Sequence, residues 1–222
     1  MISLPDDSIS SQREILAQTC RKLQQANNRG DLGARIADLV LQHSPSDFQR
    51  MMMNFGDKIE DLPPEYRDRL AKKINEHLLG TYQRIRLLRQ QGVFGTMKEP
   101  VTEHQKKYWD MVCQQFPDTE KKDASPLRFL KYLISGFCML VLHEPGHAVG
   151  TSFPGGGSVQ VINGIYYCPV RQKANDVDAA LCPFCPAVQT PDIGYLRPAV
   201  NPSEHQKQEL IEHCHKFHNF NG

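Results

Sequence analysis

Apolar residues recur at the spacing of α-helices through the first two thirds of the chain, and the breaks between these stretches carry capping residues, glycines and prolines. Ser44-Pro45-Ser46-Asp47, for example, is typical of a helix start, and the methionine-containing stripe that follows it indicates a buried helix face. The pattern predicts helices over residues 8–30, 31–44, 45–55, 63–92, 100–116 and 125–142.

The last of these helices differs from the others because it is apolar nearly all round from Tyr132 to Leu142. A helix without a polar face is expected at the centre of a bundle. Its apolar run is too short to cross a bilayer, and Arg128 and Lys131 flank it. We therefore expect a mainly α-helical fold, a multi-helix bundle packed around this buried helix, and no membrane span.

After Leu142 the helical periodicity stops, and prolines, glycines, cysteines and histidines replace it. Residues 158–162 and 165–167 are rich in β-forming side chains, and Asn163-Gly164 lies between them. Both turn residues accept the positive φ angles of a tight hairpin. The sequence therefore predicts a β-hairpin followed by an irregular Cys/His-rich loop.

We expect one domain over residues 1–222, with a helical body (1–142), a hairpin and Cys/His module (143–200) and a C-terminal helix (201–222). The C-terminal helix carries a second group of metal-binding residue types, His213, His215 and His218. A solvated helix end explains these histidines better than a second metal site does, and their role is left open.

Charge excludes several classes of function. The 222 residues include 26 Lys and Arg against 25 Asp and Glu, a net charge of +1, so no global basic field attracts a nucleic-acid backbone. The start of the chain is acidic and has no apolar core typical of a signal peptide, which favours a cytoplasmic protein. Nucleic-acid binding stays open as a minor alternative because the outer face of the helix over 63–92 carries Arg67, Arg69, Lys72, Lys73, Arg84, Arg86 and Arg89.

Seven cysteines in a chain without an export signal suggest free thiols or metal ligands rather than disulfides. Cys182 and Cys185 form a C-x-x-C pair, and Cys168 precedes them at the end of the predicted hairpin. Three thiolates suit Zn²⁺, which usually takes four tetrahedral ligands. His147 is our choice for the fourth ligand, with His143 and Cys138 as alternatives.

Two other interpretations of these cysteines remain. An iron–sulfur cluster is the second metal alternative, and reduced cysteines that simply pack as small apolar side chains need no metal at all. A structural zinc has a physical motive, because metal binding supplies folding free energy to a segment with little regular backbone pairing. The zinc site would belong to a binding or scaffold protein.

His143-Glu144-Pro145-Gly146-His147 matches the H-E-x-x-H pattern of zinc proteases. That chemistry requires both histidines on one face of a helix, whereas Pro145 and Gly146 disfavour a helix here. We expect the central helix to end at this point. A metal-dependent, hydrolase-like enzyme using His143, Glu144 and His147 is kept as an alternative function.

Several blocks between Leu142 and Gln189 resemble one family, the uncharacterised, mainly methanogen-archaeal domain of unknown function 2115. The blocks are His147-Ala-Val-Gly-Thr-Ser-Phe-Pro-Gly-Gly156, Tyr166-Tyr-Cys-Pro-Val170 and Cys182-Pro-Phe-Cys185 followed by Gln189. The resemblance implies a cytoplasmic archaeal protein and carries no established activity or substrate. Cys168, Cys182, Cys185 and His147 match the family's positions, whereas His143 and Glu144 lie outside the pattern.

Overall fold

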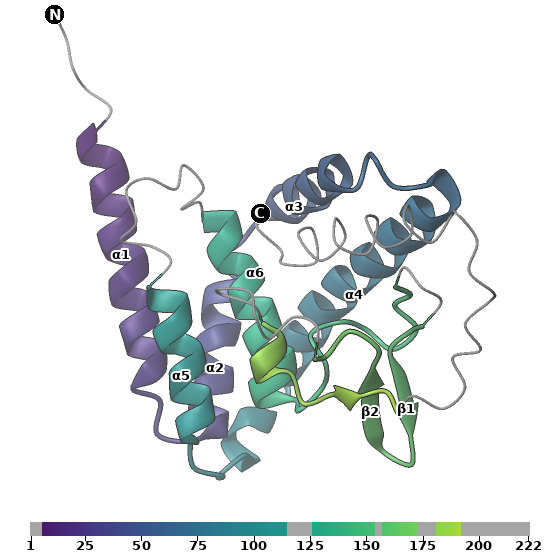
Figure 1. The fold of residues 1–222 in the computed structure, drawn as a ribbon. Coiled ribbons are helices and arrows are strands. Elements are labelled where there is room, and N and C mark those ends of the chain that lie inside the picture. Colours follow the sequence, from purple (N-terminus) through teal and green to yellow (C-terminus); the bar gives the residue numbers. More distant parts are fainter. Residues whose placement is uncertain (1–5, 115–125, 154–156, 173–180, 192–222) are drawn as a thin grey trace, which may run out of the picture.

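The computed structural model describes residues 6–114, 126–153, 157–172 and 181–191, with side chains from Glu14 onward. These ranges are mainly helical with a small sheet, which confirms the predicted fold class (Figure 1). The helices are α1 (Asp6–Gln24), α2 (Arg29–Val40), α3 (Pro45–Lys58), α4 (Pro64–Gln90), α5 (Glu103–Cys113) and α6 (Pro126–Gly136).

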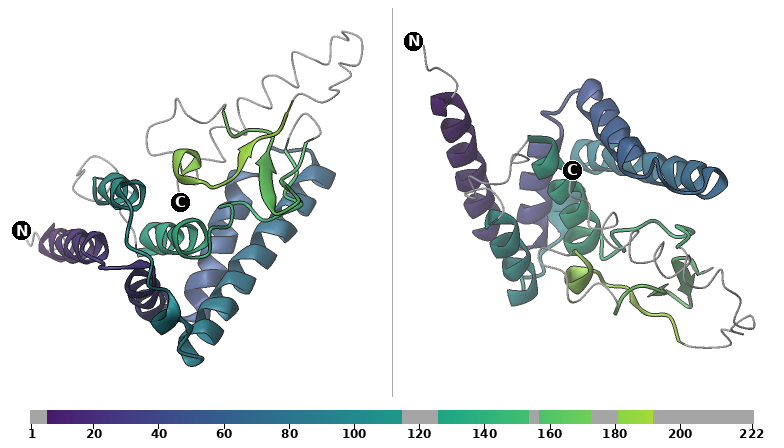
Figure 2. Two further views of the ribbon diagram at one scale, coloured as in Figure 1. Left: turned by 90° about the horizontal axis from the view of Figure 1, so that it is seen from below. Right: turned by 45° about the horizontal axis from the view of Figure 1, so that its top comes forward.

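Helix α6 lies at the centre of the bundle. The view from below places it between the pair α1 and α5 on one side and the pair α3 and α4 on the other, with α2 beside it (Figure 2). Contacts join α1 to α5, α3 to α4, and α2 to both α4 and α6. Residues 128–141 are all buried, so the expectation of a helix without a solvent face is confirmed.

The central helix does not end as a regular α-helix. Phe137–Val141 form a π-helix, in which the Leu142 amide donates to the Phe137 carbonyl over 3.0 Å. A π-turn accommodates one extra residue in the helix and is common near functional sites. The expected helix over 125–142 is therefore correct in extent but not in the geometry of its final turn.

Helix starts follow local capping chemistry. Ser44 and Asp47 form a capping box at the predicted start of α3. The second helix, predicted to begin at residue 31, begins about one turn earlier, and the Asn28 side chain caps it by accepting from the Asp31 amide over 2.8 Å. Asp31 instead binds Arg35 one turn later, with an Nε–Oδ1 distance of 2.8 Å.

The predicted hairpin is confirmed as strands β1 (Gln160–Ile162) and β2 (Ile165–Cys168), and Asn163 and Gly164 adopt positive φ angles of 51° and 78° in the turn. A third strand, β3 (Val188–Gln189), pairs parallel to β2 and had no sequence signal. Its register places Gln189 opposite Cys168. The parallel pairing thus returns the C-x-x-C segment to the end of the hairpin.

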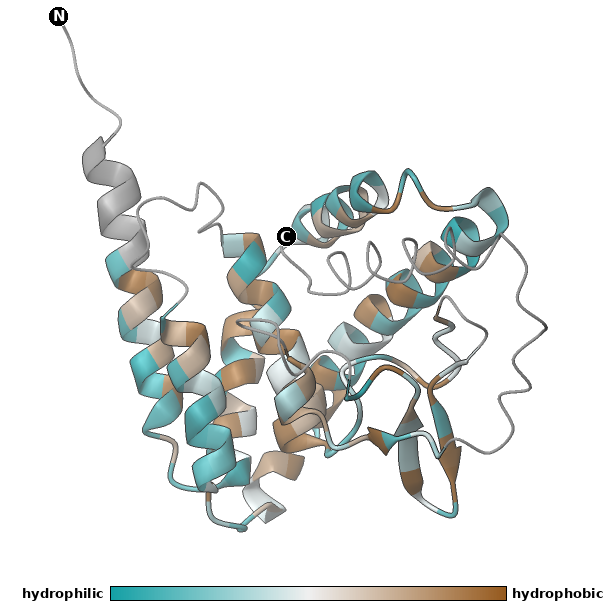
Figure 3. Ribbon diagram, viewed as in Figure 1, coloured by the Kyte–Doolittle hydropathy of each residue, from teal (hydrophilic) through white to brown (hydrophobic). Residues whose placement is uncertain are grey.

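The hydropathy of the ribbon follows this arrangement, with apolar residues on α6 and on the helix faces turned toward it (Figure 3). The hairpin is an exception, since Val161, Ile162 and Ile165 are each about half exposed. Among the residues with described placement, no helix combines the length and apolar character needed to cross a membrane.

Cys20 of α1 and Cys113 of α5 form a disulfide bond with a Cα–Cα distance of 5.6 Å. This corrects the expectation that the scattered cysteines are free thiols. The two helices lie side by side, and the pairing joins residues 93 positions apart in the sequence. The expected C-terminal helix with His213, His215 and His218 lies outside the described residues.

Candidate metal centre and its surroundings

Three elements bring Cys168, Cys182 and Cys185 together. Cys168 ends β2, and Cys182 begins a short 3₁₀-helix (Cys182–Phe184). Cys185 caps that helix, because its amide donates a hydrogen bond to the Cys182 carbonyl over 3.0 Å. The Cys168 carbonyl accepts from the Thr190 amide over 3.1 Å, which fixes the chain after the 3₁₀-helix beside β2. All three are free thiols, and Cys168 is buried.

The three sulfurs lie close enough to affect one another's ionisation. Burial raises the pKa of Cys182 to about 12, and the neighbouring thiols of Cys185 and Cys168 add to the shift. Burial likewise raises the pKa of Cys168 to about 11, again with a contribution from Cys185. The guanidinium of Arg171 opposes both shifts, and its Nε donates to the Ala187 carbonyl over 3.1 Å. A cation on the same loop is thus positioned to favour the thiolates.

His147 lies at the edge of the same module. Its ring packs edge-on against Phe153 with a centroid distance of 5.5 Å. Phe153 shares a hydrophobic cluster with Cys168, and Cys185 packs against that cluster. Within the described ranges, however, no group of three or more His, Cys, Asp or Glu side chains is arranged to hold a metal ion. A metal-bound state would require the sulfurs to rotate toward a common centre.

The H-E-x-x-H segment is not helical, as expected, because the central helix ends at Val141. Glu144 forms a salt bridge with Arg84 of α4, and both carboxylate oxygens lie 2.7 Å from the guanidinium. His143 adopts a left-handed backbone with φ of 56°, and its Nδ1 lies 3.4 Å from Arg29. Two different arginines therefore hold these neighbouring residues, and the single helix face needed by a zinc protease does not form.

Sequence reasoning missed a buried pair beneath this loop. The Cys138 sulfur lies 3.9 Å from Nε2 of His77 and 3.7 Å from the Thr81 hydroxyl. Burial raises the pKa of Cys138 to about 12. Burial lowers the pKa of His77, and a hydrogen bond with the Gly146 backbone partly offsets this shift. Cys138 also interacts electrostatically with Cys185, so the core thiol faces the cysteine module.

Intramolecular salt bridges neutralise part of the basic face of α4. Arg84 binds Glu144, and Arg89 binds Asp38 of α2 with an Nε–Oδ1 distance of 2.8 Å. These pairs reduce the positive potential that the sequence suggested for nucleic-acid binding.

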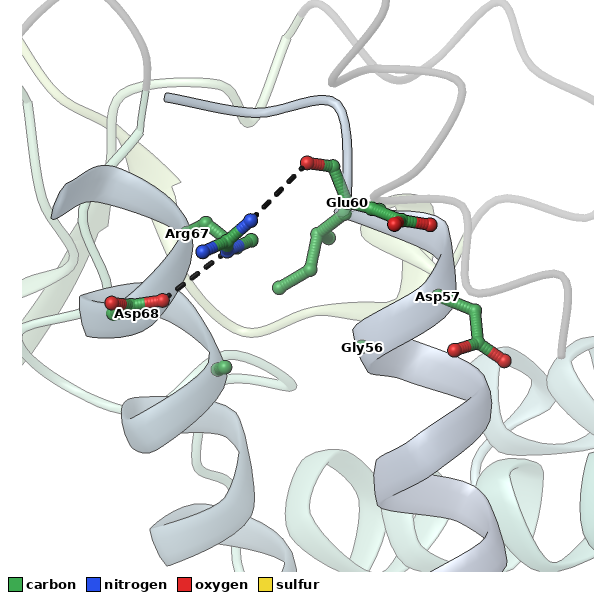
Figure 4. Close-up of a pocket in the computed structure, with 7 residues that line it drawn as sticks. Gly56, Asp57, Glu60, Arg67 and Asp68 are labelled. Carbon is green, nitrogen blue, oxygen red and sulfur yellow. Dashed lines mark hydrogen bonds and ion pairs between the residues drawn. The ribbon is translucent and has the colours of Figure 1, made fainter. Parts of the chain in front are cut away.

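A hollow of about 300 Å³ lies where α3 ends and α4 begins (Figure 4). Arg67 crosses it, with contacts to the Asp68 carboxylate at 3.2 Å and the Glu60 carbonyl at 3.5 Å. Arg67 is thus held across the hollow by groups of its own rim.

Fold and local geometry define a mainly helical protein in which a small three-stranded sheet and a loop with three cysteines pack against a buried helix. The chain belongs to the family described as "Uncharacterized protein conserved in archaea (DUF2115)", whose model matches residues 28–190. This match covers the helical body from α2 onward and the cysteine module.

Curated relatives are UPF0305 proteins of methanogenic archaea. One from Methanothermobacter thermautotrophicus is 33% identical over 40% of this chain and 54% of its own length. One from Methanopyrus kandleri is 29% identical over 37% of this chain and 58% of its own length, so the chain spans little more than half of these relatives. One from Methanocaldococcus jannaschii is 23% identical over 56% of this chain and 73% of its own length. No solved structure matches the chain.

Proposed function

We propose that this protein binds one zinc ion through the thiolates of Cys168, Cys182 and Cys185, with the imidazole of His147 as the fourth ligand. The metal is structural, and the protein acts as a binding or scaffold protein. The observation that carries this proposal is the convergence of the three thiols from β2 and the 3₁₀-helix, which depends on the parallel pairing of β3.

The donor set fits zinc. Three sulfurs and one imidazole form a common tetrahedral structural site, with Zn–S distances of about 2.3 Å. Zinc stabilises the thiolate form outright, which overcomes the burial that keeps these thiols protonated in the absence of metal. Cys182 begins a short 3₁₀-helix and Cys185 caps it, and both are only half-buried, so an incoming ion has access to their thiols.

The sheet also needs an additional source of stability. Its strands contain three, four and two residues, and most side chains of β1 and β2 are at least partly exposed. Two- or three-stranded sheets of this size bury too little apolar surface to be stable alone. A zinc ion linking β2 to the segment before β3 would supply the missing free energy.

Measuring the metal content of the purified protein tests this proposal directly. The full chain is purified without added metal or chelator, and zinc and iron are quantified by plasma mass spectrometry. We expect close to one zinc per chain, and loss of most of it in Cys182→Ala and Cys185→Ala. Metal-free protein, or variants that retain all their zinc, would contradict the proposal, and iron with sulfide would indicate a cluster instead.

The fourth ligand is tested by a matched pair of histidine variants. His147→Ala should lower zinc affinity, whereas His143→Ala should leave it unchanged because that side chain is exposed and lies beside Arg29. Equal zinc affinity in both variants would remove His147 from the site while leaving the three cysteines in place.

A further inference from the structure

A buried cysteine and a histidine face each other beneath the loop that follows the central helix. Cys138 lies in the π-helix (Phe137–Val141) that continues α6, and it is only 1% exposed. His77 lies on α4 and is half-buried, so the pair is not sealed from solvent. The proposed zinc site uses neither residue.

The distance between the two side chains suits a metal ion. The Cys138 sulfur lies 3.9 Å from Nε2 of His77. Metal–thiolate and metal–imidazole bonds of about 2.3 and 2.0 Å place their donor atoms about 3.5 Å apart at a tetrahedral angle and about 4.3 Å apart in a straight line. The observed separation lies between these limits. An ion bound between the two atoms would therefore have a wide S–metal–N angle, which is typical of an ion with few ligands.

The His77 ring is oriented as a metal ligand requires. A hydrogen bond with the Gly146 backbone raises the pKa of His77, which identifies the Gly146 carbonyl as the acceptor of a ring N–H. Since a neutral imidazole has one N–H, Nε2 keeps its lone pair toward Cys138. Metal-binding histidines are commonly held in this way by a carbonyl on the other ring nitrogen.

A hydroxyl supports the thiolate form of Cys138. The Thr81 hydroxyl lies 3.7 Å from the Cys138 sulfur, and its hydrogen bond lowers the pKa of that thiol. Burial has the larger, opposite effect, because a thiolate alone would place a negative charge in the core. A bound monovalent cation removes this cost, since the ion and the thiolate together carry no net charge. A dication would leave one positive charge buried.

The charged groups around the pair are of mixed sign. The Glu144 carboxylate interacts with both residues, whereas Arg84 acts on Cys138 and Lys73 acts on His77. Glu144 is itself in a salt bridge with Arg84. These groups therefore supply no strong negative potential for a dication, which again favours a monovalent ion.

We propose that Cys138 and His77 form a binding site for a soft monovalent cation of the Cu⁺ type. The ion displaces the thiol proton, which leaves to solvent, and forms one bond to the sulfur and one to Nε2. No electron is transferred. Thiolate sulfur selects Cu⁺ over harder ions, and Cu⁺ accepts fewer ligands than the four that Zn²⁺ usually takes. The site differs from the proposed zinc site in both its ligands and its metal.

Counting bound copper tests the proposal on the full chain. The protein is saturated with Zn²⁺ and titrated with Cu⁺ under anaerobic conditions, with bicinchoninate as a competing chelator. Wild-type protein should retain one more copper ion than Cys138→Ala and His77→Ala. His143→Ala, which removes an exposed histidine of the neighbouring loop, should match the wild type. Equal copper in all four proteins would overturn the proposal and leave Cys138 and His77 as a hydrogen-bonded pair.

Two further variants separate this site from the cysteine module. The triple variant Cys168→Ser, Cys182→Ser, Cys185→Ser lacks the proposed zinc ligands and should still bind one copper ion. Loss of all copper in this folded variant would place the copper in the module and would also overturn the proposal. Thr81→Val should keep one copper ion but bind it about tenfold more weakly, because the hydrogen bond to the sulfur is lost.

X-ray absorption at the copper edge decides the question where a variant fails to fold. Wild-type protein that holds zinc and one copper ion should show one sulfur and one nitrogen around the copper, with few other ligands. A shell that contains sulfur but no nitrogen would exclude His77 and overturn the proposal. The zinc proposal is tested separately, because Cys138→Ala and His77→Ala should each keep their zinc.

Discussion

Two glycines on different helices make a matched pair for testing how α2 begins. A Cβ atom added to Gly30 would overlap the backbone carbonyl oxygen of Phe94 and would lie 2.7 Å from that of Met97. A Cβ added to Gly80, within α4, would meet nothing within 4 Å. Gly30→Ala and Gly80→Ala thus make the same chemical change in opposite surroundings.

The magnitudes follow from the contacts. Alanine in place of glycine stabilises a helix by about 1 kcal/mol, and Gly80→Ala should gain about that amount. Gly30→Ala gains the same stabilisation from helix propensity, but its Cβ must displace backbone atoms, which cannot rotate away as a side chain could. The displacement breaks the hydrogen bonds from Gly30 to Met97 and from Arg29 to Glu99, at about 1 kcal/mol each, and overpacking adds about 1–3 kcal/mol. We expect a net loss of about 2–4 kcal/mol in the free energy of unfolding.

Urea unfolding followed by circular dichroism measures both variants under identical redox conditions. The midpoint should fall for Gly30→Ala and rise for Gly80→Ala, with unchanged slopes. If both variants shift in the same direction by similar amounts, helix propensity alone governs these sites. The close contact between α2 and residues 94–97 would then be wrong.

Three further changes probe other contacts. Arg84→Met removes the partner of Glu144 and should cost only about 0.5–1 kcal/mol, because the pair is partly exposed; hydrogen exchange should nevertheless quicken in residues 143–150 and stay slow in α6. Reduction of the Cys20–Cys113 disulfide, which closes a loop of 93 residues, should lower stability by about 3–5 kcal/mol in urea titrations with and without reductant. Lys131→Met should raise stability at neutral pH, since the folded-state pKa of Lys131 is lowered and the unfolded chain binds its proton more tightly. This gain should shrink as pH rises toward the unfolded pKa of about 10.4, and a gain independent of pH would contradict the cost of burying the charge.

Local chemistry explains what the sequence predicts well. Asn163-Gly164 requires positive φ angles wherever it forms a tight turn, so the hairpin follows from two residues. The capping box at Ser44 follows in the same way from side chains three positions apart. The apolar run from Tyr132 to Leu142 predicts burial because no polar face is available.

Contacts between distant segments explain what the sequence does not predict. Strand β3 has only two residues, so its pairing with β2 leaves no periodic pattern to detect. The Cys20–Cys113 disulfide depends on how α1 packs against α5. His77 looks like any polar residue of a long helix, and only the tertiary fold places it beside Cys138. The cysteine spacing predicts a possible ligand set, but the path of the intervening loop decides its geometry.

The π-turn at the end of the central helix bears on which histidine lies nearer the proposed zinc site. One extra residue rotates the following chain by about 100° relative to a regular α-helix. The Cys138 carbonyl accepts from the Glu144 amide over 2.9 Å, and the Glu144 side chain is thereby directed to Arg84. His143, one residue earlier, lies beside Arg29 in a left-handed conformation. The ring of His147 packs on Phe153, which shares a hydrophobic cluster with Cys168, so these contacts favour His147 over His143 as the proposed ligand.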